Sequence, residues 1–180
     1  MIIRRGRFNI ILWPVLLLAV FLVGCSTSGS NKKFSVVRLH LEVNRDISDR
    51  SSAVPIYRDK PVMVNVEKDP FLGEGTIQEA RVVDVVGGFA VRLKFERRGT
   101  WLLEQYTGSN RGKRIAIYGE FFAPPDLKTN VTRWLAAPVI TQRISDGVLT
   151  FTPDATREEA NQLVRGLTKL AKKTADDLKW

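Results

Sequence analysis

The sequence contains very little of the chemistry that most enzymes use. Among its 180 residues there is one cysteine, Cys25, and one histidine, His40. A disulfide within the chain is therefore excluded, as is a zinc site built from histidine and cysteine ligands of one chain. The chain has no Gly-x-Ser-x-Gly nucleophile elbow for which His40 could act as the general base, and His40 lies at an outward position of a predicted strand. We therefore expect a surface imidazole. We predict neither an enzyme nor a bound cofactor or metal.

The sequence also lacks an apolar run long enough to form a membrane-spanning helix. The stretch from Ile10 to Val23 is shorter than the roughly 20 residues that cross a bilayer. It follows three arginines within the first seven residues, which is typical of a secretory signal. It ends in Leu22, Val23, Gly24 and Cys25, and these four residues resemble the lipobox of bacterial lipoproteins.

The lipobox resemblance implies how the N-terminal part of the chain is processed. Residues 1–24 would be a signal peptide, and the thiol of Cys25 would receive the lipid. Residues 25–33 are rich in serine and would form a flexible tether, and Ser26 favours the outer membrane if the cell has two. An uncleaved membrane anchor is the alternative for the apolar run.

The remaining 156 residues are about enough for one domain, which we place at 34–173 with a C-terminal tail at 174–180. Without the signal arginines, 25 basic against 19 acidic residues give a net charge of +6. No aromatic-interleaved basic stripe is present, so nucleic acid is not an expected partner. An anionic phospholipid or an acidic partner fits better. The simpler interpretation, which we prefer, is that the lysines near residue 170 favour a helix C-terminus and solubility.

Apolar and polar residues alternate with period two along much of the chain, which predicts strands. The predicted strands cover 35–44, 61–68, 80–86, 89–96, 114–118, 137–144 and 148–152. Gly87-Gly88 predicts a tight hairpin, and Asp146-Gly147 predicts another between the last two strands. A short helical turn is expected from Thr76.

Two helices complete the predicted fold. Residues 97–106 show helical spacing, and we expect Trp101 to pack in the core. Thr156 and Glu159 have the spacing of a capping box, which predicts a helix up to about Lys173. The pattern indicates an α+β fold, with a mainly antiparallel sheet and two helices packed on one of its faces.

The segment 121–134 is predicted to be an inserted loop with aromatic ends. Phe121 and Phe122 stand at one end and Trp134 at the other. These three residues would form either a small satellite core or a partner-binding edge, since tryptophan often anchors interfaces. Trp180 is expected at a ragged chain end.

Three segments, in this order, resemble the head of the first periplasmic domain of SecD, the protein-export membrane protein that works with SecF. They are Gly112-Lys113-Arg114-Ile115-Ala116-Ile117, Ala136-Ala137-Pro138-Val139-Ile140 and Glu158-Glu159-Ala160-Asn161-Gln162-Leu163. The family has a Gly-Lys strand, an Ala-Pro strand and a Glu-Glu-Ala-Asn helix start in these places. The resemblance covers 62–170, and the loop 121–133 is longer than the family's turn.

The resemblance implies a SecD-head-like fold and a surface that contacts polypeptide. We therefore expect a lipid-anchored, non-enzymatic binding domain on the periplasmic side of a membrane, assisting protein export or envelope assembly. Its partners would be the membrane, through lipid on Cys25, and Sec translocon components or exported polypeptide, which an exposed sheet edge could bind by strand addition. The alternative is a structural envelope lipoprotein that reuses the head fold without an export role.

Overall fold

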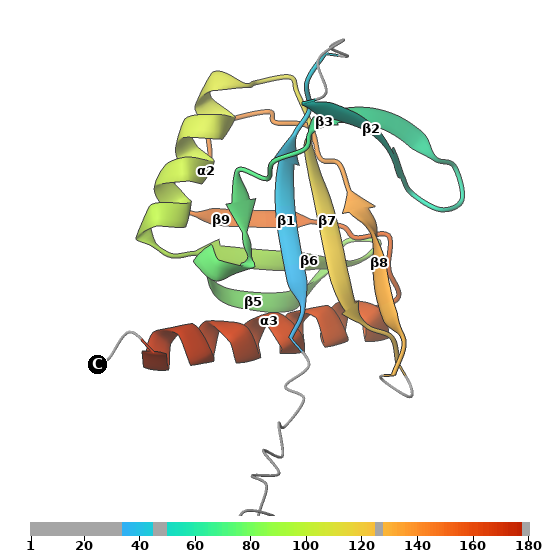
Figure 1. The fold of residues 1–180 in the computed structure, drawn as a ribbon, viewed down its shortest axis with the longest axis vertical. Helices are drawn as coiled ribbons and strands as arrows, with labels where there is room; N and C mark the ends of the chain where they lie inside the picture. The colour runs from blue at the N-terminus through green and yellow to red at the C-terminus, as the bar shows by residue number, and fades with distance from the viewer. Residues whose placement is uncertain (1–33, 45–49, 125–127, 178–180) are drawn as a thin grey trace, which may run out of the picture. The chain divides into compact units, whose positions relative to one another are not determined.

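The structure, a computed structural model, describes residues 34–44, 50–124 and 128–177 (Figure 1). These residues belong to the second of the two compact units into which the chain divides, Lys33–Trp180. The predicted signal peptide, the lipobox, Cys25 and the tether lie outside the described residues, as does Trp180.

Strands predominate in the described part of the chain. Its elements are β1 (Val36–Leu41), β2 (Ser51–Ile56), β3 (Val62–Glu67), β4 (Leu72–Gly73), the 3-10 helix η1 (Glu74–Thr76), β5 (Ile77–Val85), β6 (Gly88–Phe95), α2 (Arg97–Ser109), β7 (Ile115–Phe122), β8 (Asn130–Ala136), β9 (Val148–Phe151) and α3 (Arg157–Asp177). The predicted helical turn thus ends at Thr76 instead of beginning there, because β5 starts at the next residue.

The strands of the described chain form three antiparallel sheets. Their orders are β4-β1-β7-β8, β5-β6-β9 and β2-β3. In Figure 1, β1, β7 and β8 run upright in front, and β5, β6 and β9 lie across them behind. The α+β class, the antiparallel pairing and the two helices confirm the predicted fold class, and the single expected sheet is divided into three.

The main core fills the space between the two larger sheets. Helix α2 packs against β4 and β6, and α3 packs against β5, β7 and β1, so the helices flank this core. Each fully buried Leu, Ile or Phe contributes about 1.5–3 kcal/mol. The largest completely buried side chains of this core are those of Val37, Leu39, Leu93, Leu103, Ile115, Ile117, Phe121, Leu135, Leu163 and Leu167.

A second, smaller core lies on the opposite face of the β1–β7–β8 sheet. The β2–β3 hairpin covers this face with Val54, Ile56, Val64 and Val66, and it packs on Ala116 and Ala137 of the sheet side. Small residues are needed there because the hairpin approaches the sheet closely. The hairpin joins the end of β1 through the Val43 amide, which donates to the Asn65 carbonyl at 2.9 Å.

β8 contains a bulge, which lets residues of this strand face both the main core and the second core. Tyr118 pairs with Trp134 and Ile117 pairs with Ala136, which leaves Leu135 as the extra residue. Leu135 turns into the main core over Gly119, where a Cβ would stand only 2.4 Å from Leu135 Cδ1. The Leu135 carbonyl, free of the ladder, accepts from the Asp154 amide at 2.6 Å.

Two sequence predictions in this region are wrong. The loop predicted at 121–134 is too long, since residues 121–122 belong to β7 and residues 130–134 to β8, and these strand ends pair with each other. Alternate side chains of these strand ends meet two different environments, which conceals the strand pattern in the sequence. Residues 137–144 are not a strand: beyond an isolated bridge at Val139, the Ile140 amide donates to the Lys113 carbonyl at 2.8 Å. Consequently Asp146-Gly147 closes no hairpin, and β9 pairs with β6.

The hairpin at Gly87-Gly88 and the start of α3 match their predictions. Val85 pairs with Gly88, so the turn consists of Val86 and Gly87, and Gly87 adopts the positive φ of 85° that glycine permits. At α3 the Glu159 amide donates to Thr156 Oγ1 at 3.2 Å, and the Thr156 amide donates to Glu159 Oε2 at 2.8 Å. Glu159 also pairs with Arg133 of β8, so the capping box fastens the helix to the sheet.

The other fixed point of α3 is Gly166, which lies against the segment that leads into β1. A Cβ on Gly166 would stand 2.0 Å from Ser35 Oγ and 2.6 Å from the Ser35 backbone nitrogen. Ser35 is 2% exposed and its hydroxyl lies 3.5 Å from the Gln162 carbonyl. The chain therefore enters the domain in direct contact with α3.

We expect Gly166→Ala to lower the free energy of unfolding by about 1–3 kcal/mol, because the methyl group must displace backbone and not a flexible side-chain end. This loss outweighs the gain of up to about 1 kcal/mol that alanine brings to a helix. Urea denaturation measures the change.

Gly108→Ala in α2 is the matched control. Its Cβ would meet only the Arg143 side chain, at 3.6 Å. The control should be as stable as the wild type or more so, by up to about 1 kcal/mol. A Gly166→Ala protein that unfolds at the wild-type urea concentration would contradict the contact.

Candidate binding surface

The structure separates the three aromatic residues that the sequence grouped as a partner-binding edge. Phe121 is completely buried in the main core, so its prediction as a partner contact is wrong. Phe122, the next residue of β7, points to the other face of the sheet and is half-buried. Trp134 is paired with Tyr118, four residues before Phe122 along β7, so the structure does not bring the three together.

Trp134 belongs to a small aromatic cluster with His40 and Tyr118. Its ring centroid lies 5.1 Å from that of His40 and 5.5 Å from that of Tyr118, both with edge-on geometry. Trp134 is half-buried and packs on the second core. The structure therefore favours the satellite-core interpretation of this residue.

His40 is not the surface imidazole that the sequence predicted. It is only 7% exposed, because the β2–β3 hairpin covers the outward face of β1. Its Nδ1–H donates to the Glu67 carbonyl at 2.8 Å. Burial lowers the pKa of His40 from its ordinary value, an effect that the hydrogen bond to Glu67 only partly opposes.

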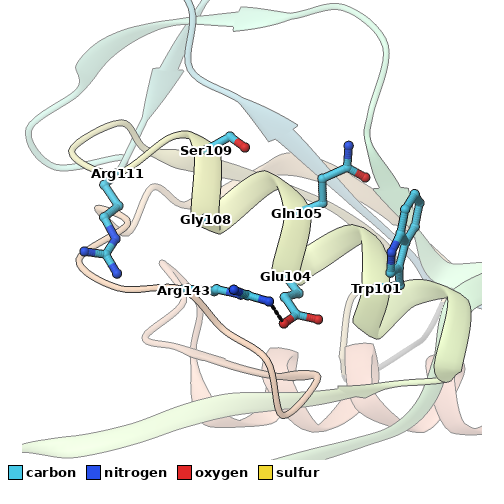
Figure 2. A pocket seen from close by; sticks show the side chains of 7 residues that line it. All are labelled: Trp101, Glu104, Gln105, Gly108, Ser109, Arg111 and Arg143. Atoms are coloured by element: carbon cyan, nitrogen blue, oxygen red, sulfur yellow. Dashed lines mark hydrogen bonds and ion pairs between the residues drawn. The ribbon is translucent and has the colours of Figure 1, made fainter.

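A concave surface of the described chain lies along α2 (Figure 2). The cleft has a volume of about 520 Å³. Its floor and walls come from α2 and from the segment around Arg143 that follows β8. Its lining residues are Trp101, Glu104, Gln105, Gly108, Ser109, Arg111 and Arg143.

Trp101 is 60% exposed at one end of this cleft, although the sequence analysis placed it in the core. The buried stripe of α2 is Gly99, Leu103 and Thr107, residues four apart on one face of the helix. A position two residues before Leu103 points away from that stripe. The signal was present in the spacing, but glycine and threonine do not count as apolar in a periodicity analysis.

The far wall of the cleft is fastened to α2 by hydrogen bonds. The buried Thr107 hydroxyl donates to the Leu103 carbonyl at 2.7 Å and accepts from the Ile144 amide at 2.9 Å. The Glu104 carboxylate pairs with the Arg143 guanidinium across the cleft, as Figure 2 shows. These contacts hold residues 143 and 144 against the helix.

The cleft offers an exposed indole face, the amide of Gln105, the hydroxyl of Ser109 and the guanidinium of Arg111. Such a combination of an aromatic anchor with adaptable hydrogen-bonding groups suits the binding of polypeptide. Within residues 34–44, 50–124 and 128–177, no cluster of three histidine, cysteine or acidic residues is placed to hold a metal ion.

His40 should make the stability of the fold depend on pH. Because its pKa is lower in the folded state than its ordinary value of 6.5, the unfolded chain binds the proton first as pH falls. Stability is therefore complete above about pH 6.5 and declines as pH falls from there toward the folded pKa. Urea denaturation between about pH 5 and pH 7.5 measures this decline.

The control for this prediction is His40→Asn, which keeps a donor near the Nδ1 position but does not titrate. It should be less stable than the wild type at neutral pH and should show a flatter pH profile. An equal slope in the two proteins would assign the decline to other groups.

The two tryptophans should respond in opposite ways to truncation. Trp134→Ala removes a half-buried ring that packs on His40, and we expect it to lower the free energy of unfolding by about 2–3 kcal/mol. Trp101→Ala removes an exposed ring, and we expect a change within about 0.5 kcal/mol. Thermal or urea unfolding of both variants tests the assignment, and a strongly destabilised Trp101→Ala protein would contradict it.

Solved structures of SecDF are similar to this chain, and two of them are compared with it. One, described as a membrane component SecDF that enhances protein export, has a TM-score of 0.51 and 19% identity, over 93% of this chain and 71% of that one. The other, SecDF in a super-membrane-facing form, has a TM-score of 0.51 and 20% identity, over 76% of this chain and 19% of that one. At these identities the likeness establishes the fold alone, and the second structure is much longer than this chain.

No helix among the described residues has the length and apolar character needed to cross a membrane. No curated protein matches the sequence. The family model described as SecDF, P1 head subdomain, matches residues 51–169. This range includes the β2–β3 hairpin, α2, the cleft wall and most of α3, and it confirms the resemblance expected over 62–170. The chain belongs to the SecDF P1 head subdomain family.

Proposed function

We propose that this protein is a lipid-anchored, extracytoplasmic and non-enzymatic binding domain that assists protein export. The family match over residues 51–169 is the observation that carries the proposal. A structure with the same fold is described as a membrane component that enhances protein export, which supports a role in the same process.

The anchoring part of the proposal rests on the N-terminal sequence. Three arginines, an apolar run and the lipobox ending at Cys25 follow one another in the order of a lipoprotein signal. Several acyl chains on one residue hold a protein at a membrane essentially permanently, at about 0.8 kcal/mol per buried methylene. Cys25 would thus be the attachment point.

The α2 cleft is the surface that we assign to partner binding. Trp101 is large, rigid and exposed, and the helix behind it is fixed by the buried Leu103 and Thr107. An anchor of this kind loses little conformational entropy on binding, which favours affinity for an extended polypeptide. Exported chains or Sec translocon components are the partners that the proposal names.

Crosslinking in intact cells tests the anchor and the cleft together. A photoreactive residue at Gln105, in the cleft, should capture exported chains or Sec components, and one at the exposed Thr150 of β9 should not. Trp101→Ala should reduce capture at Gln105 several-fold without lowering the amount of folded protein. Mass spectrometry identifies the captured partners.

Cys25→Ser is the control for anchoring. We expect it to abolish labelling by radioactive fatty acid, release the protein from membranes and remove the capture of membrane-bound partners. Labelling that survives the substitution would end the anchor model. Recovery of envelope structural proteins alone at Gln105 would favour the structural lipoprotein instead of the export role.

A further inference from the structure

Helix α3 carries four exposed cations on one side, Arg165, Lys169, Lys172 and Lys173, which we call the basic face. Their spacings of three and four residues place them along one stripe of the helix. The buried side of the same helix is defined by Ala160, Leu163, Gly166 and Leu167. The basic face is therefore directed away from the core.

The structure shows no ion pair to the stripe among the residues that it describes. Within the described chain, no ion pair joins any of its four cations to a carboxylate. The acidic residues of α3 stand at its two ends, Glu158 and Glu159 in the first turn and Asp176 and Asp177 in the last. Like charges four residues apart, as in Arg165 and Lys169, weaken an isolated helix. An external anion would remove this repulsion.

The basic face lies beside the point where the tether enters the domain. The Lys173 ammonium stands 5.7 Å from the centroid of the Phe34 ring, and Ser35 touches Gly166. Figure 1 shows α3 along the side of the domain at which β1 begins. The position of the basic face relative to Phe34 and Ser35, the first described residues of the domain, is thus fixed by packing.

Chain length limits how far this face can be from a membrane that holds Cys25. Residues 25–33 can span at most roughly 30 Å when fully extended. Lys32 and Lys33, the last two residues of this segment, add two more cations to the sequence directly before the domain. The tether therefore keeps a basic surface at a high effective concentration near lipid headgroups.

We propose that the basic face of α3 docks on anionic phospholipid headgroups of the membrane to which Cys25 is attached. The proposal rests on the proposed function for the anchor, and it adds a defined orientation of the domain on the membrane. Lipid is favoured over an acidic protein because the face adjoins the tether. The contact is electrostatic, so it is weak for each cation and is screened by salt.

Co-sedimentation with vesicles tests this docking without the anchor. The mature chain, residues 25–180, carrying Cys25→Ser is mixed with vesicles of phosphatidylcholine alone or of phosphatidylcholine with phosphatidylglycerol. We expect binding only to the vesicles that contain phosphatidylglycerol, and we expect added salt to reverse it. Equal binding to both vesicles, or to neither, would overturn the proposal.

Lys169→Gln with Lys172→Gln should reduce binding to the anionic vesicles by about tenfold or more, and the two corresponding arginine substitutions should preserve it. Arg111→Gln with Lys113→Gln is the matched control, since it removes the same charge near β7 and should reduce binding much less. All four positions are exposed, and circular dichroism checks that the variants are folded. An equal loss of vesicle binding in the control pair would show that binding depends only on net charge, and it would overturn the assignment to the basic face.

Two further outcomes show whether the docking of α3 on lipid or the anchor at Cys25 is wrong. Binding to soluble polyglutamate with no binding to anionic vesicles would indicate an acidic protein partner in place of lipid and overturn this proposal. Absence of fatty-acid labelling at Cys25 would instead defeat the anchor, and the vesicle measurement does not depend on that label.

Discussion

The pairing of β1 with β7 is the constraint on which the rest of the structure depends. Six residue pairs join these strands, and both faces of the pair are covered. Ile117 and its inward neighbours build the main core with β5, β6, β9 and the two helices, while Ala116 and His40 face the β2–β3 hairpin. A sheet covered on both sides cannot shift its register by one residue, because every side chain would exchange one core for the other. This explains why the outward face holds an alanine and a buried histidine.

The sequence predicted the elements whose signals are local. The Gly87-Gly88 hairpin, the capping box of α3 and the alternation in β1, β3 and β6 need only neighbouring residues to specify them. The elements that were predicted wrongly depend on contacts with residues far away in the sequence. The pattern of the segment 137–144 predicts a strand. In the structure, Thr107 of α2 and Lys113, which follows α2, accept hydrogen bonds from this segment. Strand β2 was missed because its buried positions, Val54 and Ile56, face the second core, and the pattern within a single strand does not reveal that core.

The candidate binding surface was less accessible to sequence reasoning than the fold was. The sequence offered aromatic residues as candidates, but the exposure of each depends on its tertiary neighbours. Phe121 is buried by the sheet that passes behind β7, and Trp134 is partly covered by the hairpin. Trp101 remains exposed because Gly99, Leu103 and Thr107 form the buried stripe of its helix. The family resemblance was detectable in short motifs at the start of β7 and of α3, because the backbone conformation at these places depends on the residues of the motifs themselves.

The Arg111 end of the cleft and the basic face of α3 lie toward opposite ends of β1. The strand begins beside Ser35 and α3, and it ends at Leu41, which pairs with Ile115 just after the segment that follows α2. Six strand residues span about 20 Å. Arg111, at the edge of the cleft, precedes Ile115 by four residues and so lies toward the end of β1 that is remote from the tether. Docking of α3 on lipid would therefore leave that end of the cleft directed away from the membrane. Membrane attachment and partner binding would then use separate surfaces, so that neither has to be released for the other to form.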